Sequence, residues 1–230
     1  MSRLFWLNGE QWSKIEPLLP HYGSPPRVDD RRILSGIVHV LRCGCRWCDC
    51  PSEYGPYTTV YNRFNRWSRK GIWQSIYSAL TGDRRTHRQL LADSTHIKAH
   101  RSAAGAKRGE QCQAIGRSRG GRTTKIHALS DGRGRPLVLA LTPGQAADIK
   151  MLPIMLDAAP LANELLADKA YDSDAVREDL LGRGMRPVIP NKDDRRFFHP
   201  FDRKRYRDDK LARNYLAALC LAALVAYWLR

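Results

Sequence analysis

The chain has 230 residues, which is enough for one large domain or two small ones. Its content of 43% apolar and 27% charged residues permits a folded core and excludes fibrous, low-complexity and globally disordered proteins. A formal net charge of +16 favours a polyanionic partner, nucleic acid first and an anionic membrane surface second.

The first 80 residues show apolar side chains at the three- and four-residue spacing of helices. Polar residues that favour helix starts precede most of these stretches. Four helices are expected: Asn8–Leu19, a second beginning at Asp29/Asp30, a third capped by Thr58/Thr59, and a fourth over residues 72–80. The sequence therefore predicts a small helical domain at residues 1–80.

Basic side chains recur along the third of these helices at Arg63, Arg66 and Arg69, followed by Lys70. Spacings of three and six residues place them on one helical face. We expect these residues to contact DNA in a unit of the helix-turn-helix type, and the alternative is an ordinary solvated surface.

Four cysteines lie between the second and third expected helices, at Cys43, Cys45, Cys48 and Cys50. Zinc modules normally use two pairs of ligands separated by a loop, and four thiols within eight residues do not close a tetrahedron easily. We therefore interpret them as small residues of a turn, with zinc as the alternative.

After a polar linker near residues 81–87 the hydrophobic period changes to two, which is typical of strands. Strands are expected at residues 90–97, 125–130, 136–141, 164–168 and 187–190, with helices at 147–158, at 173–181 and from about residue 211. This order, β-β-β-α-β-α-β-α, predicts an α/β domain with a mixed sheet and helices on its faces.

Two of the expected strands carry an acid in an apolar setting, Asp93 in Leu-Leu-Ala-Asp and Asp168 in a second Leu-Leu-Ala-Asp. A buried carboxylate is costly unless it is paired or holds a metal. If the two strands are parallel neighbours, the carboxylates converge and suit Mg²⁺ or Mn²⁺. The alternative is that each Asp ends a strand and caps the next turn.

A loop rich in Gly and Ala between His100 and Arg122 is strongly basic. Such a loop can follow phosphates through its side chains and backbone N–H groups, and the alternative is a solvated loop. The residues expected to contact DNA here are Arg101, Lys107, Arg108, Arg117, Arg119 and Arg122, together with Lys125 just beyond the loop.

The longest apolar run, Tyr215–Leu229, has 15 residues, whereas a membrane-spanning helix needs about 20. We interpret it as a buried terminal helix. With no apolar signal segment at the N-terminus, the sequence predicts a cytoplasmic, nucleoid-associated protein without a membrane partner.

A series of short segments in a fixed order resembles the bacterial insertion-sequence transposases of the DDE class, of the type called insertion sequence family five. The segments are Leu7–Trp12, Pro17–Pro20, Thr58–Phe64, Ala92–Thr95, Ala114–Gly121, Thr124–Ala128, Leu141–Gln145, Ala167–Asp172, Pro187–Pro190 and Ala212–Leu216. The resemblance implies an RNase H-like catalytic domain at residues 87–230. It also implies that Asp93 and Asp168 are the first two catalytic and metal-binding acids.

The third acid of that family is a Glu on a late helix, in a stretch of the form Tyr-x2-Arg-x3-Glu-x6-Lys. This chain has no Glu after Glu178, as though roughly 20 residues were missing near residues 207–209. Asp208 or Asp209 is the alternative source of a third carboxylate. If a helix has been lost, we expect an exposed apolar patch near the active edge of the sheet.

The resemblance implies a Mg²⁺- or Mn²⁺-dependent transposase that cuts and joins DNA, impaired here by the loss of the third acid. Its partners would be double-stranded DNA, as inverted-repeat ends and target, and further copies of itself in a synaptic complex. The alternatives are a DNA-binding remnant without catalysis and a basic RNase H-like nuclease that acts without transposition.

Overall fold

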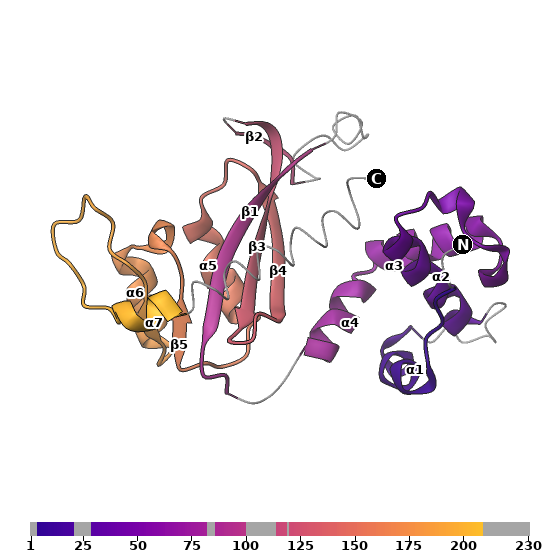
Figure 1. The fold of residues 1–230 in the computed structure, drawn as a ribbon, viewed down its shortest axis with the longest axis horizontal. Helices are drawn as coiled ribbons and strands as arrows, with labels where there is room; N and C mark the ends of the chain where they lie inside the picture. The colour runs from indigo at the N-terminus through magenta and orange to yellow at the C-terminus, as the bar shows by residue number, and fades with distance from the viewer. Residues whose placement is uncertain (1–3, 21–28, 82–85, 100–113, 119, 209–230) are drawn as a thin grey trace. The chain divides into compact units, whose positions relative to one another are not determined.

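A computed structural model describes residues 4–20, 29–81, 86–99, 114–118 and 120–208, which form two compact units divided between Thr81 and Gly82 (Figure 1). The expected linker falls partly, and the expected terminal helix entirely, outside the described residues. Among the described helices, none combines the length and the apolar character needed to cross a membrane.

The first unit is helical. Its elements are α1 (Gly9–Ile15), η1 (Glu16–Leu18), α2 (Asp30–Cys43), η2 (Trp47–Asp49), η3 (Ser52–Tyr54), α3 (Tyr57–Arg69) and α4 (Ile72–Thr81). Asn8 caps α1 in a reciprocal box, in which its side chain accepts from the Gln11 amide at 2.8 Å and the Gln11 side chain accepts from the Asn8 amide at 3.0 Å. Asp29 caps α2 by accepting from the Arg31 amide at 2.9 Å.

The predicted start of the third helix at Thr58/Thr59 is wrong, because α3 begins at Tyr57 after Pro56. Pro56 is the N-cap residue, and its side chain makes no capping hydrogen bond. Fully buried Trp67 and Tyr54 belong to the two clusters of apolar side chains that form the core of this unit.

Cys43 ends α2, and Cys45, Cys48 and Cys50 lie in the turn-rich segment around η2; none of the four forms a disulfide within the described residues. Burial raises the pKa of Cys45 and of Cys50, so both stay protonated at neutral pH. In the part of the chain that the structure describes, no three His, Cys, Asp or Glu side chains are grouped as metal ligands.

The second unit is the α/β domain. Its strands are β1 (Leu90–Lys98), β2 (Gly116–Ser118), β3 (Gly121–Asp131), β4 (Pro136–Pro143), β5 (Glu164–Leu166) and β6 (Arg186–Val188). Its helices are α5 (Asp148–Asp157), η6 (Lys169–Tyr171), α6 (Asp174–Gly182) and α7 (Arg203–Asp208). The sheet runs β2-β3-β1-β5-β6, with β4 also paired to β3. The predicted order is confirmed as far as the fifth expected strand, with β2 and α7 as additions, while the expected terminal helix lies outside the described residues.

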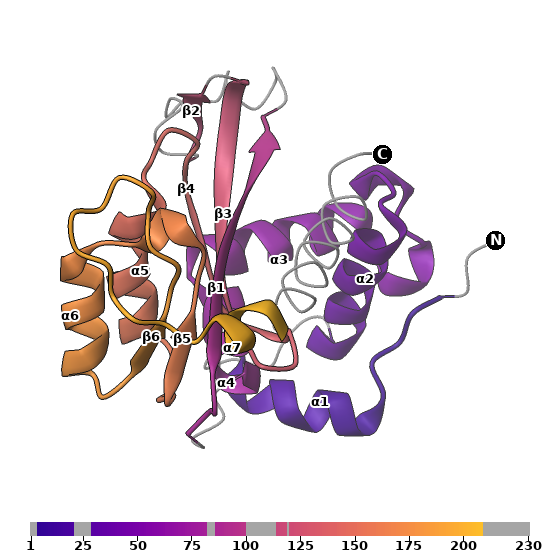
Figure 2. The ribbon, with the colours of Figure 1, turned by 60° about the vertical axis from the view of Figure 1, so that its left-hand side comes forward.

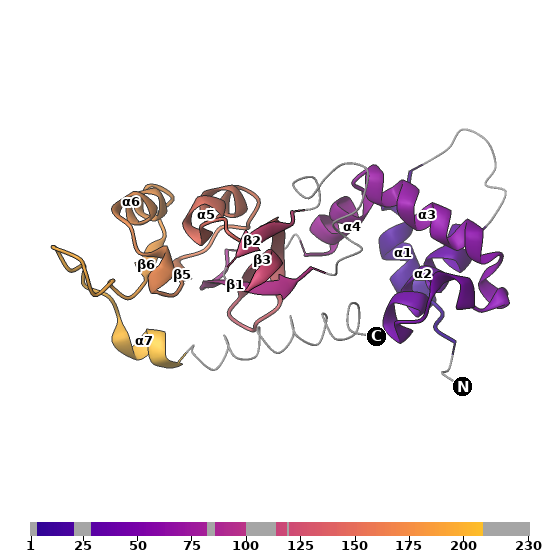
Figure 3. The same ribbon diagram turned by 90° about the horizontal axis from the view of Figure 1, so that it is seen from above.

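The mixed sheet has β1 antiparallel to β3 and parallel to β5, and β5 parallel to β6. Helices α5 and α6 cover one face and α7 lies on the other (Figures 2 and 3). Because side chains alternate along a strand, Leu90 and Leu165 pack in the main core while Leu91 and Leu166 face α7.

Candidate active site on the sheet

The two predicted acids follow the paired residues of two parallel neighbouring strands, β1 and β5. In the parallel pair of β1 and β5, Leu90 lies opposite Leu165 and Leu91 opposite Leu166. Continuing this register by two residues places Asp93 opposite Asp168. Within β1, Asp93 has the alternation of Leu91 and so belongs to the sheet face that carries α7, whereas Asp168 follows the end of β5.

Local hydrogen bonds orient each carboxylate. Asp93 Oδ1 accepts from the Ser94 amide at 2.8 Å within β1. Asp168 lies just beyond β5, which ends at Leu166 rather than at the predicted residue, and its Oδ1 accepts from the Ala170 amide at 2.9 Å to cap η6. The alternative in which Asp168 caps a turn therefore holds as well, and capping uses one of its two carboxylate oxygens.

Tyr171 is a buried phenol of the main core that senses the negative charge of both predicted acids. Its side chain is 3% exposed. Burial raises its pKa above the usual value, and the negative charges of Asp148, Asp93 and Asp168 raise that pKa further, against the effect of a hydrogen bond with Ser94. The phenol therefore stays protonated at neutral pH.

Asp148 is the first residue of α5, and the sequence does not distinguish it, because an acid in a first helical turn is common. Its Oδ1 lies 2.9 Å from Lys125 Nζ and 3.7 Å from His127 Nδ1. Lys125 Nζ also donates to the Ala146 carbonyl at 2.7 Å. Burial, as the largest effect, lowers the pKa of His127, which is therefore neutral at pH 7.

The prediction that Lys125 contacts DNA is wrong in this structure, because its side chain is 6% exposed and neutralises Asp148 inside the domain. A period-two strand shows which side chains share a face but not which face is covered. Strand periodicity alone therefore does not separate Lys125 from the basic loop before it.

Asp172 anchors the loop that follows β6, a role that the sequence does not reveal. Its buried carboxylate accepts from Arg177 Nε at 2.9 Å, from the Lys192 amide at 2.8 Å and from Arg195 Nε at 2.7 Å. Burial alone would raise the pKa of Asp172, but these bonds outweigh it and hold the pKa below the usual value.

A hollow of about 560 Å³ opens where this anchored loop meets the second acid. It is lined by Asp168, Lys169, Ala170, Lys192, Asp193 and Asp194. Lys169 Nζ pairs with Asp193 Oδ2 at 3.0 Å on its rim. The hollow gives Asp168 a side that is open to solvent.

The basic residues expected to bind DNA are distributed unevenly. Arg63 turns inward, where it pairs with Asp30 and stacks over Trp67 with its guanidinium carbon 5.3 Å from the ring centre. The prediction of Arg63 on the outer face of α3 is therefore wrong. Exposed members of the set are Arg66, Arg69, Lys70, Arg117 and Arg122, and those outside the described residues are Arg101, Lys107, Arg108 and Arg119.

Helix α7 is short and lies on the face that carries Asp93. Its Tyr206 packs against Leu91, Leu166 and Val188. The helix ends at Asp208, and Asp209 lies outside the described residues. No glutamate occurs in the sequence after Glu178, so α7 brings none to this face.

Comparisons with known proteins match both units of the chain. A family model described as "Transposase DDE domain" matches residues 84–215, more than half of the chain. A second, described as "Putative transposase of IS4/5 family", matches residues 7–77.

Individual relatives match parts of the chain. "Uncharacterized protein y4sN" of Sinorhizobium fredii is 32% identical over 44% of this chain and 83% of its own length. "Insertion element IS402 uncharacterized 16.2 kDa protein" of Burkholderia cepacia is 33% identical over 45% of this chain and 79% of its own. Among solved structures, a piggyBac transposase synaptic complex with hairpin DNA aligns at 10% identity and a TM-score of 0.47, over 81% of this chain and 48% of that chain.

Proposed function

Because the chain belongs to the DDE transposase family, with an RNase H-like domain, we propose that it binds insertion-sequence DNA but cuts it poorly. What supports this proposal is the parallel pairing of β1 and β5, each of which leads to one of the acids Asp93 and Asp168, while α7 supplies no glutamate. In this proposal the partners are inverted-repeat ends, target DNA and further copies of the chain on the nucleoid.

The two carboxylates suit one hard divalent cation, Mg²⁺ or Mn²⁺. Mg²⁺ is commonly held by one or two carboxylates, with waters and substrate phosphates completing its shell. When bound, the cation would neutralise charge on a phosphodiester and polarise it. The hydrogen bonds from the Ser94 and Ala170 amides fix the direction of the two carboxylates before any cation binds.

A second ion needs a further carboxylate to complete its shell, and in-line phosphoryl transfer by a two-ion clamp needs both ions. Asp148 does not supply it, because Lys125 already neutralises it on the other side of the sheet. Asp208 and Asp209 end or follow α7 and are the acids nearest in sequence to the place of the family's missing Glu. We therefore propose that cation binding survives while strand cleavage is strongly reduced.

Contact with DNA is proposed through exposed basic residues of both units. Arg66, Arg69 and Lys70 lie at the end of α3, and Arg117 and Arg122 flank the hairpin of β2 and β3. The net charge of +16 supports such contacts with phosphates. A DNA-binding remnant that occupies element ends without cutting them is the second candidate function, favoured by the same missing carboxylate.

The test is a cleavage assay on terminal-repeat DNA with Mg²⁺ or Mn²⁺, with DNA binding measured in the same samples. We expect binding to persist, and we expect cleavage to remain within about tenfold of an Asp93→Asn control, since removing a catalytic acid from a dead site changes little. A chain with an inserted helix that carries the Tyr-x2-Arg-x3-Glu-x6-Lys pattern should cut well above both.

Strong metal-dependent cleavage by the chain as it stands, abolished by Asp93→Asn, would contradict the impairment. If Asp208→Asn or Asp209→Asn also abolished it, one of these acids would be the third ligand. Absence of both binding and cleavage would contradict the DNA-binding part of the proposal.

A further inference from the structure

A second hollow of the α/β unit lies at the end of the sheet where β1 begins and β3 turns into β4 (Figure 1). Its volume is about 680 Å³, and we call it the arginine hollow. It is lined by Thr86, His87, Arg88, Gln89, Asp131, Gly132, Arg133 and Arg135. None of these residues lines the hollow beside Asp168, and Leu90 at the start of β1 lies about 10 Å along the strand from Asp93. The arginine hollow is therefore separate from the candidate active site.

Asp131 fixes the turn between β3 and β4, which forms one side of the arginine hollow. Its buried carboxylate accepts from the backbone amides of Arg133 and Arg135, each at 2.9 Å, and from Arg135 Nε at 2.7 Å. Burial alone would raise the pKa of Asp131, but these hydrogen bonds and the charge of Arg135 hold the pKa below its usual value. The carboxylate is thus ionised at neutral pH, and the backbone that carries Arg133 is held in place.

Arg88 and Arg133 give the arginine hollow an excess of positive charge. Both are exposed, and within the described residues no ion pair or hydrogen bond engages the guanidinium of either. Asp131, the one carboxylate among the described lining residues, is already paired with Arg135 at 2.6 Å. A guanidinium presents five N–H donors in a planar fork that matches the oxygens of a phosphate. Two such groups on one hollow therefore form a site for a phosphate.

His87 adds a further polar group without a partner. Its backbone is fixed, because its amide donates to the Leu161 carbonyl at 2.8 Å and its carbonyl accepts from the Asn163 amide at 3.1 Å. Its Nε2 atom is buried and has no hydrogen-bond partner among the described residues. Buried polar atoms are seldom left unpaired, and an oxygen of a bound phosphate is the kind of partner that this atom lacks.

We propose that the arginine hollow binds a backbone phosphate of DNA through Arg88 and Arg133. The inference rests on the proposed function, because it requires that the chain binds DNA. A phosphodiester fits better than a small phosphorylated ligand, because the arginines are exposed, whereas sites for small molecules bury most of the ligand. Contacts with phosphates position a duplex and do not read its bases. The arginine hollow would thus help to place DNA on the catalytic unit.

The test uses the full chain with Arg88 and Arg133 both replaced by Gln, and a matched control with both replaced by Lys, which keeps the charge. Affinity for a labelled terminal-repeat duplex is measured by fluorescence anisotropy at several salt concentrations. A second series uses duplexes in which one phosphate at a time is replaced by an uncharged methylphosphonate. Thermal unfolding shows that each variant is folded.

We expect the Gln variant to lower the slope of log affinity against log salt by about 1 to 2, because each phosphate contact releases about 0.9 of a counterion. The Lys control should keep the slope of the unsubstituted chain. At one or two phosphates, methylphosphonate should weaken binding of the unsubstituted chain by about fivefold and leave the Gln variant unaffected, as coupled contacts require.

The outcomes separate this inference from the proposed function. A chain that binds DNA with a steep salt dependence, but whose Gln variant keeps the same slope and the same sensitive phosphates, would overturn the inference alone. Equal losses of slope in the Gln variant and the Lys control would overturn it too, since the charge would not be the cause. If inorganic phosphate raised the melting temperature of the unsubstituted chain but not of the Gln variant, with the slope unchanged, the hollow would hold a small anion instead. Absence of DNA binding by the unsubstituted chain would contradict the proposed function as well.

Discussion

Asp93 and Asp168 differ from the other acids of the chain in the strands that lead to them. Each follows a Leu-Leu-Ala sequence, and the parallel pairing of β1 and β5 aligns the two sequences residue by residue. Two neighbouring negative charges repel each other unless a cation lies between them. In the proposed site, this repulsion favours a divalent ion.

Mg²⁺ or Mn²⁺ should raise the melting temperature of the chain, because a ligand that binds only the folded state stabilises it. At ten times the dissociation constant the gain is about 1.4 kcal/mol, or roughly 4 °C for a domain of this size. Asp93→Asn or Asp168→Asn should remove this shift and slightly raise the melting temperature of the metal-free protein. The measurement is thermal unfolding followed by circular dichroism, with and without metal.

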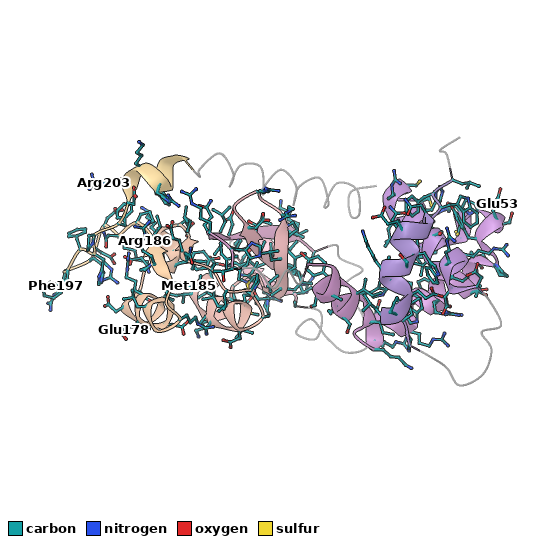
Figure 4. The ribbon with its side chains drawn as sticks, turned by 90° about the horizontal axis from the view of Figure 1, so that it is seen from below. Glu53, Glu178, Met185, Arg186, Phe197 and Arg203 are labelled. Carbon is teal, nitrogen blue, oxygen red and sulfur yellow. The ribbon has the colours of Figure 1, made fainter. Side chains whose placement is uncertain are left out.

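Glu178→Gln is the matched control, since Glu178 is an exposed acid on α6, outside the proposed site (Figure 4). It should keep the full metal shift. A metal shift that survives both aspartate substitutions would show that the cation binds elsewhere on the molecule.

At the scale of elements, the helical unit depends on a close contact between α2 and the turn η3. Gly36 of α2 lies against Tyr54, where a Cβ atom would come within 2.7 Å of the Tyr54 Cβ. Tyr54 is fully buried, and its hydroxyl donates to the Phe5 carbonyl at 2.8 Å. The ring therefore has no room to give way without losing that hydrogen bond.

Gly36→Ala should destabilise the helical unit by about 1–3 kcal/mol, the usual cost of forcing an extra carbon into a packed core. Urea unfolding followed by tryptophan fluorescence measures the change. Gly9→Ala is the control, because Gly9 begins α1 and no atom lies within 4 Å of the place that its Cβ would take. Alanine there should be neutral or slightly stabilising, and equal losses from both changes would refute the packing argument.

The elements of the α/β unit could be predicted because their signals are local. Alternating side chains in the strands and the Asp131 turn define β1, β3 and β4, and the Ser173 cap marks the start of α6. The three-residue strand β2 shows no alternation of apolar side chains in the sequence. Its first residue, Gly116, has no side chain and pairs with β3 through the backbone. A strand this short contains too few residues to show a period.

The site could be predicted only where chemistry and strand position coincide, as for Asp93 and Asp168. The predictions for Arg63 and Lys125 are wrong because their partners, Asp30 and Asp148, are distant in sequence. An ion pair of this kind depends on which helices and strands pack together. It therefore cannot be predicted from local sequence patterns before the fold is known.

At the scale of the whole molecule, charge is the dominant property. The 39 basic residues against 23 acidic ones leave +16, while several basic side chains, Arg63 and Lys125 among them, are used in internal pairs. Exposed basic residues such as Arg66 and Arg69 are therefore the ones expected to displace counterions from DNA.

Binding to duplex DNA should weaken steeply with salt, because each phosphate contact releases about 0.9 of a counterion. Substituting both Arg66 and Arg69 by Gln should reduce the slope of log affinity against log salt by about 2, uniformly across DNA sequences. Fluorescence anisotropy with a labelled terminal-repeat duplex at several salt concentrations measures the slope. Lys150→Gln, an exposed change on α5, should leave the slope as it was.

The substitution Arg63→Gln distinguishes a basic residue of α3 that forms an internal ion pair from those of α3 that are expected to contact DNA. It should lower the stability of the helical unit, because Asp30 loses its buried partner. In folded protein, however, it should leave the salt slope unchanged, since its guanidinium is paired with Asp30 inside the helical unit. If substituting Arg63 lowered the slope of log affinity against log salt as much as substituting Arg66, Arg63 would contact DNA after all. If the affinity did not change between low and physiological salt, the proposal of a nucleic-acid partner would be wrong.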